Sequence, residues 1–127
     1  MRHIFYKIFA IAIIAGLVAC ASIPSVQFTP GTYRGTGEGF SGDIVVEVVV
    51  DAEKILEINM VSQHETAEIG GPAIKQLPQA IVKGQTLKID KVSGATYTCE
   101  GIIDAVTDAL SQSGVDIDVL SNRKAAK

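Results

Sequence analysis

The sequence predicts a single α+β domain in which an antiparallel β meander, a half-barrel-like sheet, packs with two helices. Two observations lead to this expectation. Residues 31–61 show strand-like alternation of apolar and polar side chains, and residues 72–110 carry two apolar stripes with helical spacing. With 127 residues, the chain has room for one domain and no more.

The three predicted strands follow one another along the chain. Residues 32–40 are interleaved with glycines and closed by Gly42, and the polar turn 51–54 separates the next two strands. Residues 44–50 place four aliphatic side chains on one face: Ile44, Val46, Val48 and Val50. Residues 55–61 alternate again, and we expect one apolar face and one polar face, formed by Leu56, Ile58 and Met60 and by Glu57 and Asn59, respectively.

The glycines of the first strand invite comparison with a dinucleotide-binding loop, because residues 35–39 read GTGEG. Such a loop follows a strand and opens a helix, and neither element is expected beside these residues. We therefore expect the glycines to lie within a strand, at bends or where another group approaches the backbone closely.

The first predicted helix opens at Pro72, which suits the first helical position, and ends at Gly84. Pro78 lies inside it and is expected to kink the helix or to split it in two, because proline cannot donate to the helical hydrogen-bond ladder. The apolar stripe that identifies this helix consists of Ala73, Ile74, Leu77, Ala80 and Ile81.

The second predicted helix has Thr98 as its N-cap and Glu100 in its first turn, and Gly114 ends it. Its buried face is Ile102, Ile103, Val106, Ala109 and Leu110, with Asp104, Thr107 and Asp108 facing water. Residues 115–120 alternate and are expected to form a late strand, and residues 121–127 a frayed tail.

Residues 1–19 have the three parts of an export signal. Arg2 and Lys7 form a short basic start, and an apolar run of twelve residues follows, too short for a permanent membrane span of about 20 residues. Leu17 to Cys20 (LVAC) resembles the bacterial lipobox, which implies that Cys20 is lipidated and that residues 20–30 form a tether on the membrane. A plain secretory signal and an uncleaved anchor are the alternatives.

The remaining chain is acidic. Without Arg2 and Lys7 it has nine basic residues against fourteen acidic ones. Such a balance gives no electrostatic attraction to nucleic acid or to an anionic membrane surface, so we expect no nucleic-acid partner.

The segment DKVSGATYTCE, residues 90–100, is the strongest candidate for a functional site. Ser93, Gly94, Ala95 and Thr96 form a tight loop of small residues that leads into a helix N-terminus. A phosphate group attached to Thr96 would lie beside unpaired backbone N–H groups. An ordinary capping loop is the alternative that these residues alone leave open.

This string resembles the flavinylation motif of the FMN-binding domain shared by the C subunit of the sodium-translocating NADH:quinone reductase and the G subunit of the Rnf complex. The motif residues here are Asp90, Ser93, Gly94, Ala95 and Thr96. The resemblance covers residues 31–113, and it marks residues 31–120 as the FMN-binding domain. It implies that a flavin transferase takes FMN from FAD and joins its phosphate to the Thr96 hydroxyl, outside the cytoplasm.

Further contacts to the flavin are expected from the loop 63–71 and from the residues after the motif. Glu65 and Thr66 match the family pattern, and His64 is a candidate contact or an exposed loop side chain. The remaining candidate contacts are Tyr97 and Thr98. Cys99 is expected to be a small buried residue, a redox thiol being the alternative. No residues are spaced as metal ligands, so we expect no metal site.

The resemblance implies a membrane-anchored flavoprotein of the bacterial cell envelope that carries electrons and turns over no substrate by itself. Its partners would be the flavin transferase, the lipid bilayer through Cys20, and quinone-linked or cytochrome electron donors and acceptors. An accessory module that holds flavin non-covalently, and a subunit of a larger membrane reductase complex, are the alternatives.

Overall fold

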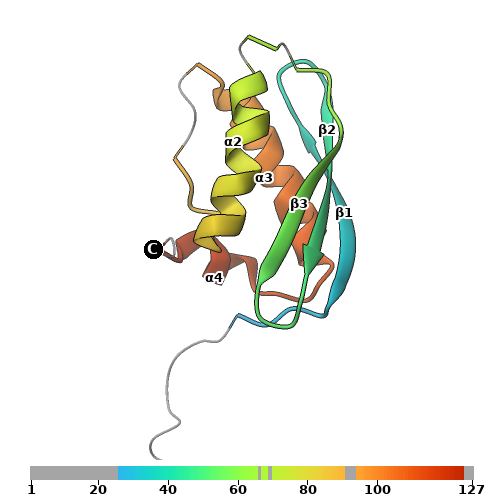
Figure 1. Cartoon of the computed structure of the whole chain (residues 1–127), viewed down its shortest axis with the longest axis vertical. Helices are drawn as coiled ribbons and strands as arrows, with labels where there is room; N and C mark the ends of the chain where they lie inside the picture. The colour runs from blue at the N-terminus through green and yellow to red at the C-terminus, as the bar shows by residue number, and fades with distance from the viewer. Residues whose placement is uncertain (1–25, 66, 69, 91–93, 125–127) are drawn as a thin grey trace, which may run out of the picture.

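The computed structural model describes residues 26–65, 67–68, 70–90 and 94–124. Three helices, α2 (Gly71–Gly84), α3 (Thr96–Ser111) and α4 (Ile117–Asn122), lie on one side of a three-stranded sheet (Figure 1). The strands β1 (Gly31–Glu38), β2 (Asp43–Val50) and β3 (Ile55–Ser62) are antiparallel in the order β1-β2-β3. The predicted α+β meander is thus confirmed. The leader with Cys20, and the site residues Thr66 and Ser93, lie outside the described residues.

The middle strand β2 supplies the sheet's share of the core. Ile44, Val46, Val48 and Val50 are all at most 3% exposed, as the alternation predicts. The apolar faces of α2 and α3 cover them, with Leu77, Ile81, Ile102, Val106 and Leu110 fully buried. No helix in the described part of the chain is long and apolar enough to span a membrane.

The glycines of β1 allow α3 to lie directly on the strand backbone. A Cβ atom on Gly35 would overlap the carbonyl of Ala105, and one on Gly37 would overlap the carbonyl of Gly101. A Cβ on Gly101 would in turn lie 2.8 Å from the carbonyl oxygen of Glu38. The expectation of a close backbone approach is therefore confirmed, and this contact holds the start of α3 beside the end of β1.

The predicted apolar face of β3 is wrong in one residue. Leu56 is 45% exposed, whereas Ile55 is buried and Ile58 and Met60 are partly buried. The reason is a pair of register shifts between β2 and β3: Val49 and Val50 pair with Glu57 and Ile55, and Val45 and Val46 pair with Ser62 and Met60. Leu56 and Val61 are the extra residues, and a bulge turns an extra residue out of the alternation.

Helix α2 is continuous through Pro78, so the alternative of two separate helices is wrong. Its last residue is Gly84, but the left-handed residue that follows is Gln85, with φ 53°. The Gln85 amide compensates for this conformation. Its Nε2 donates to the carbonyl oxygens of Ile55 at 2.8 Å and Val82 at 2.6 Å, and its Oε1 accepts from the Ile55 N–H at 2.8 Å. Gln85 thereby ties the end of α2 to the start of β3.

Two predictions for the C-terminal part are wrong. Helix α3 begins at Thr96 after the N-cap Ala95, so Thr98 lies inside the first turn and Glu100 lies beyond it. Residues 117–122 form the short helix α4 instead of a strand, because the Asp116 side chain accepts the N–H of Asp118 at 3.0 Å and caps a helix there. Ser121 and Asn122 therefore belong to α4, and the predicted tail shortens.

Candidate functional site

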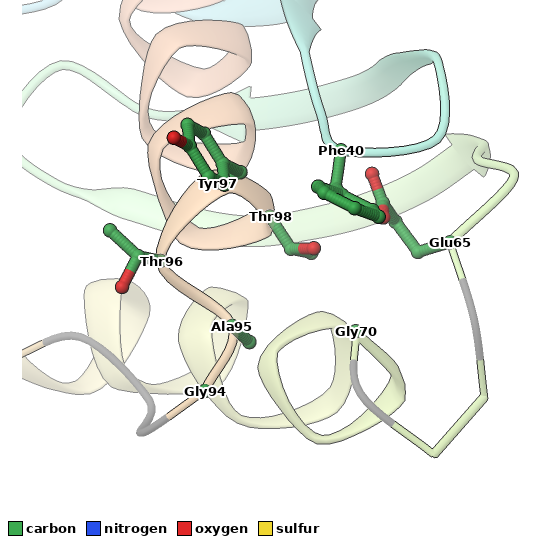
Figure 2. Close-up of a pocket in the computed structure, with 8 residues that line it drawn as sticks. All are labelled: Phe40, Glu65, Gly70, Gly94, Ala95, Thr96, Tyr97 and Thr98. Carbon is green, nitrogen blue, oxygen red and sulfur yellow. The ribbon is translucent and has the colours of Figure 1, made fainter.

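A pocket of about 260 Å³ opens at the end of the molecule where the β1–β2 hairpin, the loop after β3 and the first turn of α3 meet. We call this the cofactor end. The pocket is shown in Figure 2, and its lining residues are Phe40, Glu65, Gly70, Gly94, Ala95, Thr96, Tyr97 and Thr98. Its volume lies just below the range of about 300–1,000 Å³ that is common for small-molecule sites, so a large cofactor would lie partly outside it.

The start of α3 gives the pocket its capacity for an anion. The Cys99 N–H bonds the Ala95 carbonyl oxygen at 2.9 Å, so the N–H groups of Thr96, Tyr97 and Thr98 precede the first helical hydrogen bond. Among the described residues no side chain caps this helix, since the N-cap residue is Ala95, and Gly94 has a left-handed φ of 81° with open space where a Cβ would be. Uncapped N–H groups and the positive end of the helix dipole favour a phosphate group at this position.

The three hydroxyl-bearing residues of the first turn differ in their surroundings. Thr96 and Tyr97 are exposed, whereas Thr98 is 1% exposed. In Figure 2, Thr98 points toward the space between Phe40, Glu65 and Gly70, and the side chain of Thr96 extends away from it. Thr96 is thus the threonine of this turn whose hydroxyl a modifying enzyme could reach.

Glu65 joins the loop after β3 to the β1–β2 hairpin. Its Oε1 accepts the N–H of Ser41 at 3.4 Å, and its own N–H donates to the Gln63 Oε1 at 2.7 Å. Close approach of Glu65 to Gly39 and Gly70 leaves no room for a Cβ on either glycine. The carboxylate is therefore held at the wall of the pocket, where it can accept a hydrogen bond from a ligand.

Two exposed aromatic rings flank the pocket. Phe40 is 69% exposed and Tyr97 is 65% exposed, and their ring centroids lie 6.0 Å apart at an interplanar angle of 36°. Phe40 is carried by the tight hairpin turn in which the Gly39 N–H donates to the Gly42 carbonyl oxygen at 2.9 Å. A flat ligand that enters the pocket would contact these rings.

The structure brings together most of the residues that the sequence singled out. Gly94, Ala95, Tyr97 and Thr98 share the pocket with Thr96 and Glu65. His64 is exposed, lies near Gly42 of the hairpin and does not line the pocket. Asp90 is exposed and does not line it either. Cys99 is fully buried in the core, as expected for a small packing residue.

Phe40 and Gly70 line the pocket and were not predicted. Their contribution depends on the approach of the hairpin and of the loop before α2 to the start of α3. The available signals were an aromatic residue between glycines at a hairpin and the pair Gly70-Gly71 ahead of a helix. Within the described residues, no group of three or more His, Cys, Asp or Glu side chains could hold a metal ion.

A small α+β domain with a pocket at an uncapped helix start has the form of a cofactor-binding module. Residues 39–111 match the FMN-binding domain family, and the chain belongs to this family. The resemblance inferred from the residues is thus confirmed.

Two curated relatives are reductases. The chain is 38% identical over 95 residues to the NADH:acrylate oxidoreductase of Vibrio harveyi, covering 75% of this chain and 10% of that protein. It is 35% identical over 94 residues to the urocanate reductase of Eggerthella lenta, covering 74% of this chain and 16% of that protein. The chain therefore corresponds to a small part of each of these much longer relatives.

The residues of the pocket fit FMN. The N–H groups at the start of α3 suit its phosphate, the rings of Phe40 and Tyr97 suit its flat ring system, and the Glu65 carboxylate suits a ring N–H donor. Gly70 and Gly94 keep the pocket free of side chains at two points of its wall.

Proposed function

We propose that this protein is an electron carrier that holds FMN covalently, through a phosphoester to Thr96, outside the cytoplasm. The observation that carries the proposal is the position of Thr96. It is exposed, it is the first residue of a helix whose N-cap residue, Ala95, offers no capping side chain, and it borders the pocket of a domain in the FMN-binding family. A phosphate joined to its Oγ1 would lie close to the N–H groups of that helix turn.

Bound FMN supplies the redox chemistry, because a flavin accepts and releases one or two electrons. The protein's own residues attach, orient and tune it. The first turn of α3 would stabilise the phosphate charge, and Phe40 and Tyr97 would shield the ring from water. A carboxylate at the pocket wall, supplied by Glu65, would disfavour additional negative charge on a bound flavin ring.

The attachment and the location belong together in this proposal. A flavin transferase that takes FMN from FAD is the expected partner for attachment, and an ester bond retains a cofactor that is not resupplied outside the cell. The leader with Arg2, Lys7 and the LVAC sequence supports export and lipidation at Cys20, which would keep the domain on a membrane of the cell envelope near quinone-linked or cytochrome partners.

The two relatives support a second candidate function, in which this domain delivers electrons to a reductase. One is an oxidoreductase and the other a reductase, and the matched region makes up 10% and 16% of the two proteins. Both candidates need the same flavin. They differ in whether the acceptor is a separate carrier or a reductase that acts on an unsaturated substrate.

The experiment that tests the attachment compares two threonine substitutions. Thr96→Val removes the hydroxyl, and Thr36→Val makes the same change at an exposed position of β1 that does not line the pocket. Each protein is exported together with a flavin transferase, and intact mass and peptide mapping follow. We expect Thr36→Val and the wild type to gain one FMN less one water on the peptide containing residue 96.

Thr96→Val is expected to lack this added mass while its thermal unfolding stays cooperative. Thr96→Ser is expected to keep it, because a serine hydroxyl offers the same nucleophile. Full covalent loading of Thr96→Val would reject the attachment site. An unmodified wild type, with the transferase shown to be active on another substrate protein, would favour the non-covalent accessory module.

A further inference from the structure

The cofactor end of the molecule concentrates exposed aromatic surface. Four large hydrophobic side chains of the described residues are exposed: Phe40, Leu56, Val61 and Tyr97. Leu56 and Val61 are the bulge residues of β3, turned outward by the register shifts. Phe40 and Tyr97 come from different elements and meet at the pocket. Exposed aromatic residues that meet at one place are typical of the centre of a protein interface.

The same end concentrates negative charge. Five acidic residues lie toward this end, on the β1–β2 hairpin, the loop after β3 and the third turn of α3: Glu38, Asp43, Glu65, Glu68 and Asp104. Glu38 and Asp43 face each other across the β1–β2 pair on either side of Phe40. Asp104 lies seven residues after Tyr97 and therefore on the same face of α3. Lys75, in α2, is the basic residue that the described part of the chain places at this end.

The opposite end, which we call the far end, is nearly balanced in charge. It consists of the turn 51–54, the end of α2 with residues 85–88, and α4 with its flanks (Figure 1). Its acidic residues are Asp51, Glu53, Asp116 and Asp118, and its basic residues are Lys54, Lys83, Lys88, Arg123 and Lys124. The ion pair of Arg34 with Glu47, at 3.3 Å, lies between the two ends on the outer face of the sheet. The larger part of the excess negative charge of the described residues therefore lies toward the cofactor end.

We propose that Phe40 and Tyr97, with the five acidic residues around them, form the docking surface for a redox protein whose own redox centre is surrounded by Lys and Arg side chains. This inference rests on the proposed electron-carrier function. Opposite charges steer two proteins together and orient them, and such steering raises association rates by about 10- to 1,000-fold. The partner would thus arrive at the pocket and not at the far end.

The geometry suits a short-lived contact. The aromatic pair supplies a small apolar centre, and the charges stand at its rim, where they act on the rate of encounter more than on the strength of binding. Electron-transfer complexes are characteristically small, below about 1,200 Å² of buried surface. A partner docked here would place its redox centre next to the flavin and separate again after transfer.

The test measures electron transfer from the flavin-loaded, reduced protein to a cationic c-type cytochrome by stopped-flow absorbance, at low and at high salt. Glu38→Gln/Asp43→Asn removes two charges beside Phe40. Glu57→Gln/Asp118→Asn also removes one Glu and one Asp charge, but from exposed positions away from the pocket, and it serves as the matched control.

We expect the wild-type rate to fall steeply as salt is added, because about 1 M salt screens charges beyond about 3 Å. At low salt, Glu38→Gln/Asp43→Asn is expected to transfer electrons about three- to tenfold more slowly than the control variant, and the two should converge at high salt. Equal rates for the two variants at low salt, or a wild-type rate that does not fall with salt, would overturn the docking surface.

Ferricyanide, a small anionic acceptor, separates this inference from the function on which it rests. All three proteins are expected to reduce it, and Glu38→Gln/Asp43→Asn should do so at least as fast as the wild type. Failure of the loaded wild type to reduce ferricyanide would overturn the electron-carrier function itself. Normal reduction of ferricyanide, combined with equal rates for the two variants toward the cytochrome, would overturn the docking surface alone.

Discussion

At the far end of the molecule, side chains make many hydrogen bonds to main-chain groups, whereas at the cofactor end the described residues make few. Asp51, Gln85 and Thr86 together make eight hydrogen bonds to main-chain groups at the far end. At the cofactor end, the described bonds of this kind are one from Ser41 to the Glu65 carboxylate and one from Glu65 to the Gln63 amide.

The two ends therefore have different roles: the far end stabilises the fold, and the cofactor end is available to bind a ligand. The far end satisfies its own polar groups and so adds to the free energy of folding. The cofactor end keeps helix N–H groups and aromatic rings available for a ligand, and it gains partners only when that ligand is bound. Substitutions at the two ends should therefore change different observables.

The largest effect is expected for Gln85→Ala. This change leaves the N–H and C=O of Ile55 without their side-chain partner and keeps the left-handed backbone of residue 85, so the free energy of unfolding should fall by about 2–3 kcal/mol. Urea denaturation measures it, with Gln76→Ala, at an exposed glutamine within α2, as the control. Flavin loading should be unchanged at low temperature.

Gln85→Gly sharpens this prediction, because glycine adopts the left-handed conformation without strain. It should lose less stability than Gln85→Ala while it lacks the same hydrogen bonds. If Gln85→Ala and Gln76→Ala unfold at the same urea concentration, the far end does not depend on the Gln85 amide and the comparison between the two ends fails.

A smaller, pH-dependent effect is expected at Asp51. Its carboxylate accepts the N–H groups of Glu53 and Lys54 at 2.8 Å each, and these bonds, with the Lys54 charge, lower the pKa of Asp51 below its ordinary value of 3.8. The unfolded chain then binds the proton more readily than the folded one. The stabilisation is therefore complete above the ordinary pKa and is lost as the pH falls through the lower, folded value.

Asp51→Asn retains an acceptor of the same shape without the charge, so it isolates this contribution. The wild type should melt at a higher temperature than Asp51→Asn at neutral pH, and the difference should shrink at a pH below 3.8. A difference in melting temperature that stays constant from neutral to acidic pH would show that the charge of Asp51 does not matter.

The smallest effect on stability, and a clear effect on the flavin, is expected for Phe40→Ala. Because Phe40 is 69% exposed, the free energy of unfolding should change by less than about 0.5 kcal/mol. The flavin fluorescence of the loaded protein should nevertheless be quenched more strongly by iodide, because the ring loses its cover. Leu56→Ala, at an exposed residue away from the pocket, should leave the quenching at the wild-type level. Equal quenching in both variants would remove Phe40 from the site.

The features that were predictable from the sequence are those with a short-range cause. The alternation of residues 44–50 and the stripes of α2 and α3 follow from burying one face of each element, and the structure confirms them. The small residues Gly94, Ala95 and Thr96 predicted a loop with room for a phosphate at a helix start, and all three line the pocket.

The features that were missed depend on contacts between distant segments. The bulges in β3 arise from its pairing with β2, so Leu56 is exposed despite its place in the alternation. The early start of α3 accompanies packing of Thr98 against Gly70, which places an inward-facing threonine where a cap was expected. Phe40 joins the pocket only because the hairpin folds back on α3. The Asp116 cap of α4, in contrast, was visible in the sequence and outweighs the alternation that follows it.

The two bulges of β3 also affect the tendency of the protein to aggregate at high concentration. β3 is an outer strand of the sheet, and an outer strand with free N–H and C=O groups can recruit a strand from another molecule. Two irregularities within eight residues interrupt the regular repeat that such recruitment requires. The bulges therefore make the edge of β3 less able to pair with another strand, even though Leu56 and Val61 lie exposed along it.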